Sequence, residues 1–266
     1  MGKYTSVDDP SAFFQAKTYT GTSNIHDVTL DGNSDMQPDW VWFKNRTVNY
    51  THQLYDSSRG VTKALYSQGT NAEATITNGL TRFDPDGFRV TSAAAVNEDE
   101  MVCWNWKANG GTTVSNTDGD LTSTVQFNST AGFAMVTYTG KSPIEPLDVG
   151  HGMGEVPDMF IIKNRSGSRL WSMYHKELTS PAQNRYLILN DHQYGELANS
   201  THFRNEAPTT TVIKTGENAA VNQPNENFIV YAWKERQGFS KFGKYVGNGS
   251  TNGTFVYTGF KPAWIM

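Results

Sequence analysis

The chain has 266 residues, of which 18% are charged and 12% aromatic, and its formal net charge at pH 7 is −4. This length suits two domains that each bury a core, and the many Gly, Thr, Asn and Ser residues indicate short strands joined by polar turns. No run of Lys or Arg occurs, so the basic surface of a nucleic-acid-binding protein is missing and we expect no nucleic-acid partner.

The single cysteine, Cys103, lies in an apolar run, where a free thiol behaves as a small hydrophobic side chain. It can form no disulfide within the chain, which disfavours a disulfide-rich secreted scaffold but suits a protein that folds in a cytoplasm and is released later. No apolar stretch approaches the length of a membrane span, and residues 1–5 lack the apolar region of a signal peptide. We therefore expect no membrane insertion.

The chain repeats itself at a spacing of 119 residues. The tetrapeptide TYTG at residues 18–21 returns at 137–140, and the stretch PDWVWFKNR at 38–46 is answered by PDMFIIKNR at 157–165. A repeat of this length corresponds to a whole domain rather than to one turn of a solenoid.

Both units are predicted to contain the same series of strands. Alternating strands open the units, and a run that is apolar on both faces follows each proline, as expected for a central strand covered on both sides. Strong apolar strands close the units at a spacing of 127 residues. The predicted strands, in chain order within the units, are 14–19 and 133–138, 40–43 and 159–162, 53–55 and 172–174, the regions near Phe88 and Val212, and 101–107 and 228–234.

No long stretch shows helical periodicity, and an amphipathic sheet must bury one face against another sheet. We therefore predict an all-β chain of two tandem β-sandwich domains, of jelly-roll or lectin-like type, related by the internal repeat. The first domain is expected at residues 1–114 and the second at 115–266, and the glycine-rich stretch 108–119 is the best linker candidate.

The C-terminal residues are predicted to open a third repeat unit. Although YTG recurs at 257–259, we interpret that match as coincidence, because 244–247 matches 137–140 and 261–266 matches 156–161 at nearly the same spacing, 107 and 105 residues. Two explanations are open: the natural protein continues beyond Met266, or these strands close the second domain. In either case we expect the apolar end to be buried or paired, since exposed strand edges invite pairing.

Taken together, the YTG strand, the PDWVWFKNR strand, the WNWK strand end at 104–107 and the VSNTDG link at 114–119 resemble a repeat family of structural proteins from marine bacteriophages. The GFSKFG stretch at 238–243, followed by YVGNG, is similar to later repeats of that family. The resemblance implies a virion component of a tail, fibre or other appendage, made in the host cytoplasm and extracellular in the particle. It carries over no catalytic or ligand-binding residue.

Motifs of enzyme chemistry are missing from the sequence. It has no nucleophile elbow, P-loop or dinucleotide-binding fingerprint, and its six histidines show no metal-ligand spacing. The stretch DGNSD at 31–35 alternates oxygen ligands as a calcium loop does, but Met36 and Trp42 stand where glycine and glutamate are needed, so we interpret it as a solvated turn. We expect no cofactor, no metal and no enzymatic activity.

Glycan hydrolysis is kept as the second alternative. It needs two carboxylates facing each other across a cleft. The acidic stretch 98–100 and the pair Asp84 and Asp86 supply carboxylates, but both lie in sequence typical of loops, and their counterparts in the second unit are not evident acidic pairs.

Sugar binding is the first alternative, because aromatic faces stack on sugar rings while neighbouring polar side chains bind hydroxyls. Four residues in predicted loops or strand ends could do this, namely Tyr50, Trp171, Tyr194 and His202. Packing or subunit contact is the competing role of these four, and the remaining tryptophans of the strands are expected to fill the cores.

The repeated tripeptide KNR, at 44–46 and 163–165, is expected to solvate a strand end and to form turn hydrogen bonds. Because two copies rarely keep one active site, this repetition favours a structural role. The function expected is that of an oligomeric structural or adhesive virion module, whose partners are copies of itself and other virion proteins. The first alternative is a module that recognises a host surface glycan.

Overall fold

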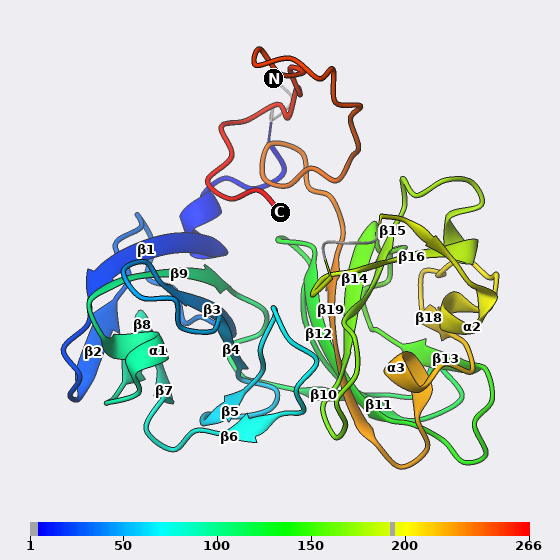
Figure 1. The fold of residues 1–266 in the computed structure, drawn as a ribbon, viewed down its shortest axis with the longest axis horizontal. Helices are drawn as coiled ribbons and strands as arrows, with labels where there is room; N and C mark the ends of the chain where they lie inside the picture. The colour runs from blue at the N-terminus through cyan, green and yellow to red at the C-terminus, as the bar shows by residue number, and fades with distance from the viewer. Residues whose placement is uncertain (1–4, 192–194) are drawn as a thin grey trace.

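The computed structural model describes residues 5–191 and 195–266, and it is built mainly of antiparallel strands with short helices between them. Figure 1 shows the first half of the chain (blue to blue-green) beside the second half (green to orange), with the C-terminal segment (orange to red) above both. The predominantly β character predicted from the sequence is confirmed. In the part of the chain described, no helix has the length and apolarity that crossing a membrane would require.

The first half is centred on a four-stranded sheet. Of its two central strands, that at residues 40–45 is rich in Trp, Val and Phe and is buried on both faces, as the continuous apolar pattern predicts. The strand at residues 100–106 alternates between buried and less buried residues. In spatial order the strands are β1 (Phe14–Thr20), β9 (Glu100–Trp106), β3 (Trp40–Asn45) and β4 (Gln53–Asp56).

Smaller elements cover the outer face of this sheet. They enclose a core that includes Phe43, Phe88 and Val96. These elements are the sheet of β2 (His26–Thr29), β8 (Gly87–Val90) and β7 (Leu80–Asp84), the hairpin of β5 (Lys63–Ala64) and β6 (Ala74–Thr75), and the helix α1 (Ala94–Asn97); a 3₁₀ turn, η1 (Pro10–Ala12), precedes β1.

The second half is centred on an eight-stranded sheet, and four of its strands, β12, β19, β14 and β15, lie in the same order as the four of the first sheet. In spatial order the strands are β10 (Val114–Asn116), β11 (Ser123–Asn128), β12 (Phe133–Thr139), β19 (Asn227–Trp233), β14 (Met159–Asn164), β15 (Ser172–His175), β16 (Arg185–Ile188) and β17 (Leu197–Ala198). The strands predicted for the second unit are confirmed.

The outer face of this second sheet is also covered. The core there includes Phe160, Phe203 and Val221. The covering elements are β13 (Leu147–Gly150), β18 (Val212–Thr215), α2 (Ser200–Phe203) and α3 (Ala219–Asn222), with the 3₁₀ turn η2 (Ala182–Asn184) beside β15 and β16.

The inner faces of the two large sheets share one aromatic core. The ring of Trp40 stacks on Tyr231 at 4.3 Å between centroids and on Phe133 at 5.9 Å. Trp106 and Trp233 belong to the same buried cluster. Each such aromatic pair contributes about 0.5–1.5 kcal/mol beyond the burial of its area. The central core is therefore built from both halves of the chain.

The two short helices α1 and α3 have the identical sequence AAVN. The hydroxyl of Tyr19 donates to the carbonyl of Val96 in the first half, and the hydroxyl of Tyr138 donates to the carbonyl of Val221 in the second. The tyrosine of each YTG stretch thus fixes the helix that precedes the closing strand of its own half.

The stretch predicted as a linker, residues 108–119, is held in place at its start. The buried carboxylate of Asp39 accepts hydrogen bonds from the backbone N–H groups of Ala108, Gly110 and Gly111 at 2.7 to 2.8 Å. The strand β10 also forms within this stretch. The division at residue 114 stays a prediction.

The expectation of a buried or paired C-terminal end is wrong for most of this segment. Residues 241–266 contain no strand, and Ile265 is 81% exposed. Trp264 anchors the end, because its ring contacts Trp42 and Trp106 at the border of the central core.

Candidate functional site

Trp171, predicted as a sugar-stacking residue, lies in the central core. Its side chain is fully buried, and its indole N–H donates to the carbonyl of Tyr66 at 2.9 Å. A buried ring has no free face for a sugar. The position serves the packing of the two halves instead.

His202 is also buried, and its ring stacks on Tyr186 with the centroids 3.7 Å apart. Burial lowers the pKa of His202 to about 4, and its Nδ1 atom has no hydrogen-bond partner. The neutral imidazole is therefore a packing element of the second half.

Tyr50 is half-buried at the opposite part of the molecule, in the first half, where its hydroxyl contacts Glu98 at 3.3 Å. The negative charge of Glu98 raises the pKa of Tyr50. Tyr194 lies outside the described residues. The three candidates that are described belong to three separate environments, so the structure does not bring them together.

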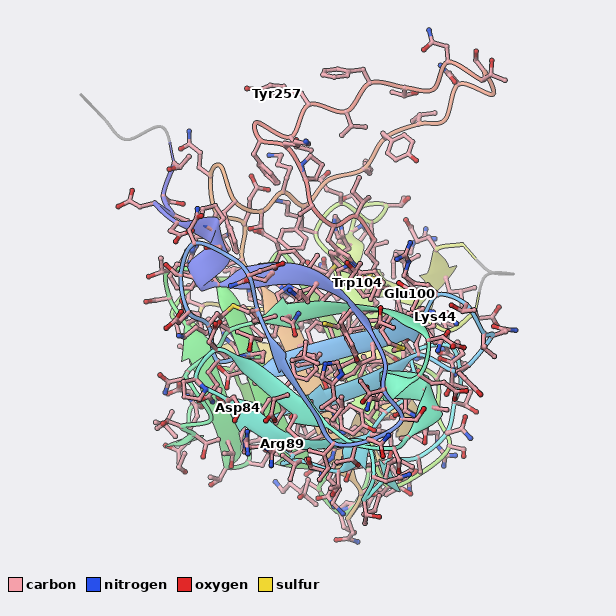
Figure 2. The ribbon with its side chains drawn as sticks, turned by 90° about the vertical axis from the view of Figure 1, so that its left-hand side faces the viewer. Lys44, Asp84, Arg89, Glu100, Trp104 and Tyr257 are labelled. Carbon is pink, nitrogen blue, oxygen red and sulfur yellow. The ribbon has the colours of Figure 1, made fainter. Side chains whose placement is uncertain are left out.

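The candidate carboxylates also stay apart. Asp84 pairs with Arg82, and Asp86 accepts the backbone N–H of Met36. Figure 2 shows Asp84 well separated from Glu100, which accepts a hydrogen bond from Thr20. No pair of these acids faces the other across a cleft, as a glycan hydrolase would need.

No group of three or more His, Cys, Asp and Glu residues suited to a metal ion occurs within residues 5–191 and 195–266. In the stretch that resembles a calcium loop, the carboxylate of Asp31 pairs with Lys17 at 2.8 Å. That side chain is largely exposed, as expected for a solvated turn.

The KNR repeat makes the predicted turn hydrogen bonds. The side-chain oxygen of Asn45 accepts from the N–H groups of Thr47 and Val48, and that of Asn164 accepts from Ser166 and Gly167, all at 2.7 to 2.9 Å. These bonds cap the turn after each central strand and confirm the structural interpretation of the asparagines.

The lysine of the second KNR copy differs from the expected solvated residue. Lys163 is fully buried, and its Nζ atom donates to the carbonyls of Thr70 and Arg169 at 2.8 Å. Burial lowers the pKa of Lys163 to about 8. The prediction of a solvated strand end is wrong here, because a loop of the first half covers this side chain.

That loop belongs to a polar network joining the halves. Asp56 and Arg59 form a fully buried ion pair with 2.5 Å between Oδ2 and Nε. The hydroxyl of Tyr231, from β19, donates to the same carboxylate at 2.6 Å. On the other side, Glu73 binds both Arg59 and Arg165. The repeat does not signal this network, because its contacts join residues of the two halves that lie far apart in the sequence.

Apolar exposure concentrates in the C-terminal segment of the described chain. In Figure 2, Tyr257 lies on a loop that extends away from the sheets. Such exposure is typical of a surface through which chains assemble, since monomeric proteins rarely leave large apolar side chains together in water. The exposed fractions are 67% for Tyr245, 84% for Val246, 85% for Phe255, 72% for Tyr257 and 81% for Ile265.

A polar surface hollow of about 340 Å³ lies at the end of the second large sheet. Hydroxyl, amide and guanidinium groups dominate its walls. The lining residues are Leu121, Thr122, Thr124, Thr137, Tyr138, Thr139, Arg165 and Asn227.

A family model described as a domain of unknown function, DUF7483, matches residues 9–266, and the chain belongs to this family. The match runs continuously through both halves and the C-terminal segment. No curated protein and no solved structure matches the chain.

Proposed function

For this member of the DUF7483 family, we propose a structural or adhesive role in a bacteriophage tail, fibre or other appendage, exercised by association with copies of itself and with other virion proteins. The exposed apolar side chains of the C-terminal segment are the observation that carries the proposal. Burying such side chains between chains gains free energy in proportion to the apolar area removed from water.

The same proposal includes two tandem β-sandwich units and the beginning of a third. Three observations support it: the shared strand order of the two large sheets, the constant spacing of 119 residues for three pairs of strands, and the AAVN helix before each closing strand. A repeated scaffold that displays loops and an exposed apolar segment suits an elongated assembly.

Association is tested by light scattering on the full chain over a hundredfold range of concentration. We expect a mass that rises with concentration towards a defined multimer. In the variant Phe255→Ser/Tyr257→Ser, the mass should rise only at a protein concentration at least tenfold higher. A matched control is Phe239→Leu, which alters an apolar residue that packs against the central core. A monomer at every concentration would remove the basis of the proposal.

Glycan recognition is the second candidate function. The observation that favours it is the polar hollow on the second sheet, which is a better candidate location for a sugar than the aromatic residues predicted from the sequence. Threonine hydroxyls and an asparagine amide there match the hydrogen-bonding needs of a sugar. A glycan array tests it: binding that Thr124→Val/Thr137→Val abolishes would place a sugar site at the hollow. Unchanged binding, or none, would exclude the hollow as that site.

A further inference from the structure

The sequence contains four asparagine–glycine pairs, at residues 78–79, 109–110, 248–249 and 252–253. In such a pair the backbone nitrogen of the glycine can attack the side-chain carbonyl carbon of the asparagine, because glycine has no Cβ atom to obstruct the approach. The attack needs a glycine N–H group that no other acceptor holds, and an asparagine side chain that can turn towards it. The four pairs differ in both respects.

In the two pairs that lie within the folded halves, the glycine N–H group is engaged. Gly79 donates to the carbonyl of Ile76 at 3.1 Å, and Gly110 donates to the buried carboxylate of Asp39 at 2.8 Å. The side chains of both asparagines also donate hydrogen bonds, at 3.2 and 2.9 Å. Since attack would require these bonds to break, we expect both pairs to be protected while the chain is folded.

The two pairs of the C-terminal segment, which lies above both halves in Figure 1, have different surroundings. All four of their residues are exposed. Among the described residues, no acceptor binds the N–H groups of Gly249 and Gly253. A Cβ atom at either glycine would meet nothing within 4 Å. The backbone nitrogen of each glycine is therefore available for the attack.

The asparagine side chains distinguish these two exposed pairs. Asn248 donates from Nδ2 to the carbonyl of Asn252 at 2.9 Å, and its Oδ1 atom accepts the N–H of Ser250 at 3.0 Å. These two bonds hold the side chain of Asn248 in one orientation. The side chain of Asn252 makes no hydrogen bond with a described residue. Asn252 thus combines an unbound side chain with an unbound N–H group on the glycine that follows.

We infer that Asn252 is a site of spontaneous deamidation. The nitrogen of Gly253 forms a bond to Cγ of Asn252, the bond from Cγ to Nδ2 breaks, and the amide group leaves as ammonia with the proton of the glycine nitrogen. The product is a cyclic succinimide. Water then opens this ring: breaking the new bond to Cγ gives aspartate, and breaking the bond to the backbone carbonyl carbon of residue 252 gives isoaspartate. Asn248 should react in the same way but more slowly.

The reaction places a negative charge where the chain has none. The segment 243–266 carries Lys244 and Lys261 and no acidic residue, and Phe255, close to the site, is 85% exposed. Because a carboxylate is costly to bury among apolar groups, its formation should weaken association through this segment. This consequence rests on the proposed assembly function, whereas the reaction itself does not depend on it.

Peptide mapping by mass spectrometry tests the reaction. The full chain is kept folded in mildly alkaline water enriched in a heavy oxygen isotope, so that each residue converted during the incubation carries the label. We expect Asn252 to be converted at least tenfold faster than Asn78 or Asn109, with Asn248 between them. In urea, which removes the structure, all four asparagines should be converted at similar rates.

Gly253→Ala is the matched variant. The backbone of Gly253 is not left-handed and a Cβ atom there meets nothing within 4 Å, so the substitution should leave the fold unchanged. It should slow the conversion of Asn252 at least tenfold and leave that of Asn248 as it was. The inference would be overturned by equal rates at Asn252 and Asn109 in the folded chain, by conversion of Asn248 as fast as that of Asn252, or by a tenfold difference that persists in urea.

Light scattering separates the reaction from its consequence. The incubated native chain should associate only at a concentration at least threefold higher than the fresh chain, as should Asn252→Asp, whereas Gly253→Ala should not change over the same interval. If Asn252 is converted and association stays the same, the deamidation site stands and the role of the C-terminal segment in association fails. A fresh chain that is monomeric would remove the assembly function and leave the site.

Discussion

The hydroxyl of Tyr231 donates a 2.6 Å hydrogen bond to the carboxylate of Asp56, although 175 residues separate the two in the chain. Both side chains are buried, and Asp56 also pairs with Arg59. The bond crosses the central core, so it couples the first sheet to the second through a charge that water does not reach.

Substitutions at this bond should destabilise the whole chain. Tyr231→Phe removes a donor to a charged acceptor and should lower the free energy of unfolding by about 1.5–3 kcal/mol. Asp56→Asn removes the fully buried countercharge of Arg59, leaves it only the partly exposed Glu73, and should cost about 3–5 kcal/mol. Urea unfolding measures both, with the exposed Tyr245→Phe as a control. Equal stability of Asp56→Asn and the native protein would contradict the role given to the ion pair.

The glycines of the two YTG stretches should resist substitution for reasons of space. A Cβ atom at Gly21 would lie 2.2 Å from the backbone nitrogen of Glu98, and one at Gly140 would lie 2.1 Å from the carbonyl of Gln223. Forced overpacking of this kind costs about 1–3 kcal/mol. We expect that loss for Gly21→Ala and for Gly140→Ala in thermal or urea unfolding, and no loss for Gly247→Ala, where nothing lies within 4 Å.

His202 should make the protein sensitive to mild acid. Burial lowers its pKa from 6.5 to about 4, so the unfolded chain binds a proton in a range where the folded chain does not. The free energy of unfolding should therefore fall as the pH decreases from 6.5 towards 4. His202→Gln should reduce this slope in urea titrations at successive pH values. Some slope should remain, because burial also lowers the pKa of His151.

Lys163 should act in the opposite range. Its pKa is lowered from 10.5 to about 8, so above pH 8 the unfolded chain keeps a proton that the folded chain has lost. Stability should rise as the pH increases from 8 towards 10, and Lys163→Met should abolish this rise. The rise ends near pH 10, because burial raises the pKa values of Tyr138 and Tyr231 well above 10.0. Above that pH these tyrosines lose their protons in the unfolded chain but not in the folded one, so the free energy of unfolding falls. A rise of equal size in Lys163→Met would assign the effect to other groups.

The strands could be predicted because their side chains follow local periods. The runs around Val41 and Ile161 are apolar on both faces, and each forms a central strand. The helix pair could also be predicted, since AAVN occurs at residues 94–97 and 219–222, in each case shortly before the closing strand. The repeated tetrapeptide is the signal that predicts this pair.

The environment of Trp171 could not be predicted in the same way. Its neighbours Ser168 and Arg169 are polar, which is typical of a loop, whereas its indole N–H is bound by the carbonyl of Tyr66 from the other half. Contacts between residues so far apart leave no local pattern. The same holds for the bond between Tyr231 and Asp56, whose partners have no counterpart at the repeat spacing.

The shared aromatic core also sets the order in which the protein can complete itself during synthesis. Trp40 and Trp106 leave the ribosome well before Tyr231 and Trp233, and Trp233 lies 127 positions after Trp106. At roughly 5–20 residues per second, this delay lasts on the order of 6–25 s. During that time the tryptophan side chains on the inner face of the first sheet lack the second sheet that buries them in the folded protein. Exposed apolar surface of this kind makes the growing chain a substrate for chaperones and promotes aggregation between chains on one polysome.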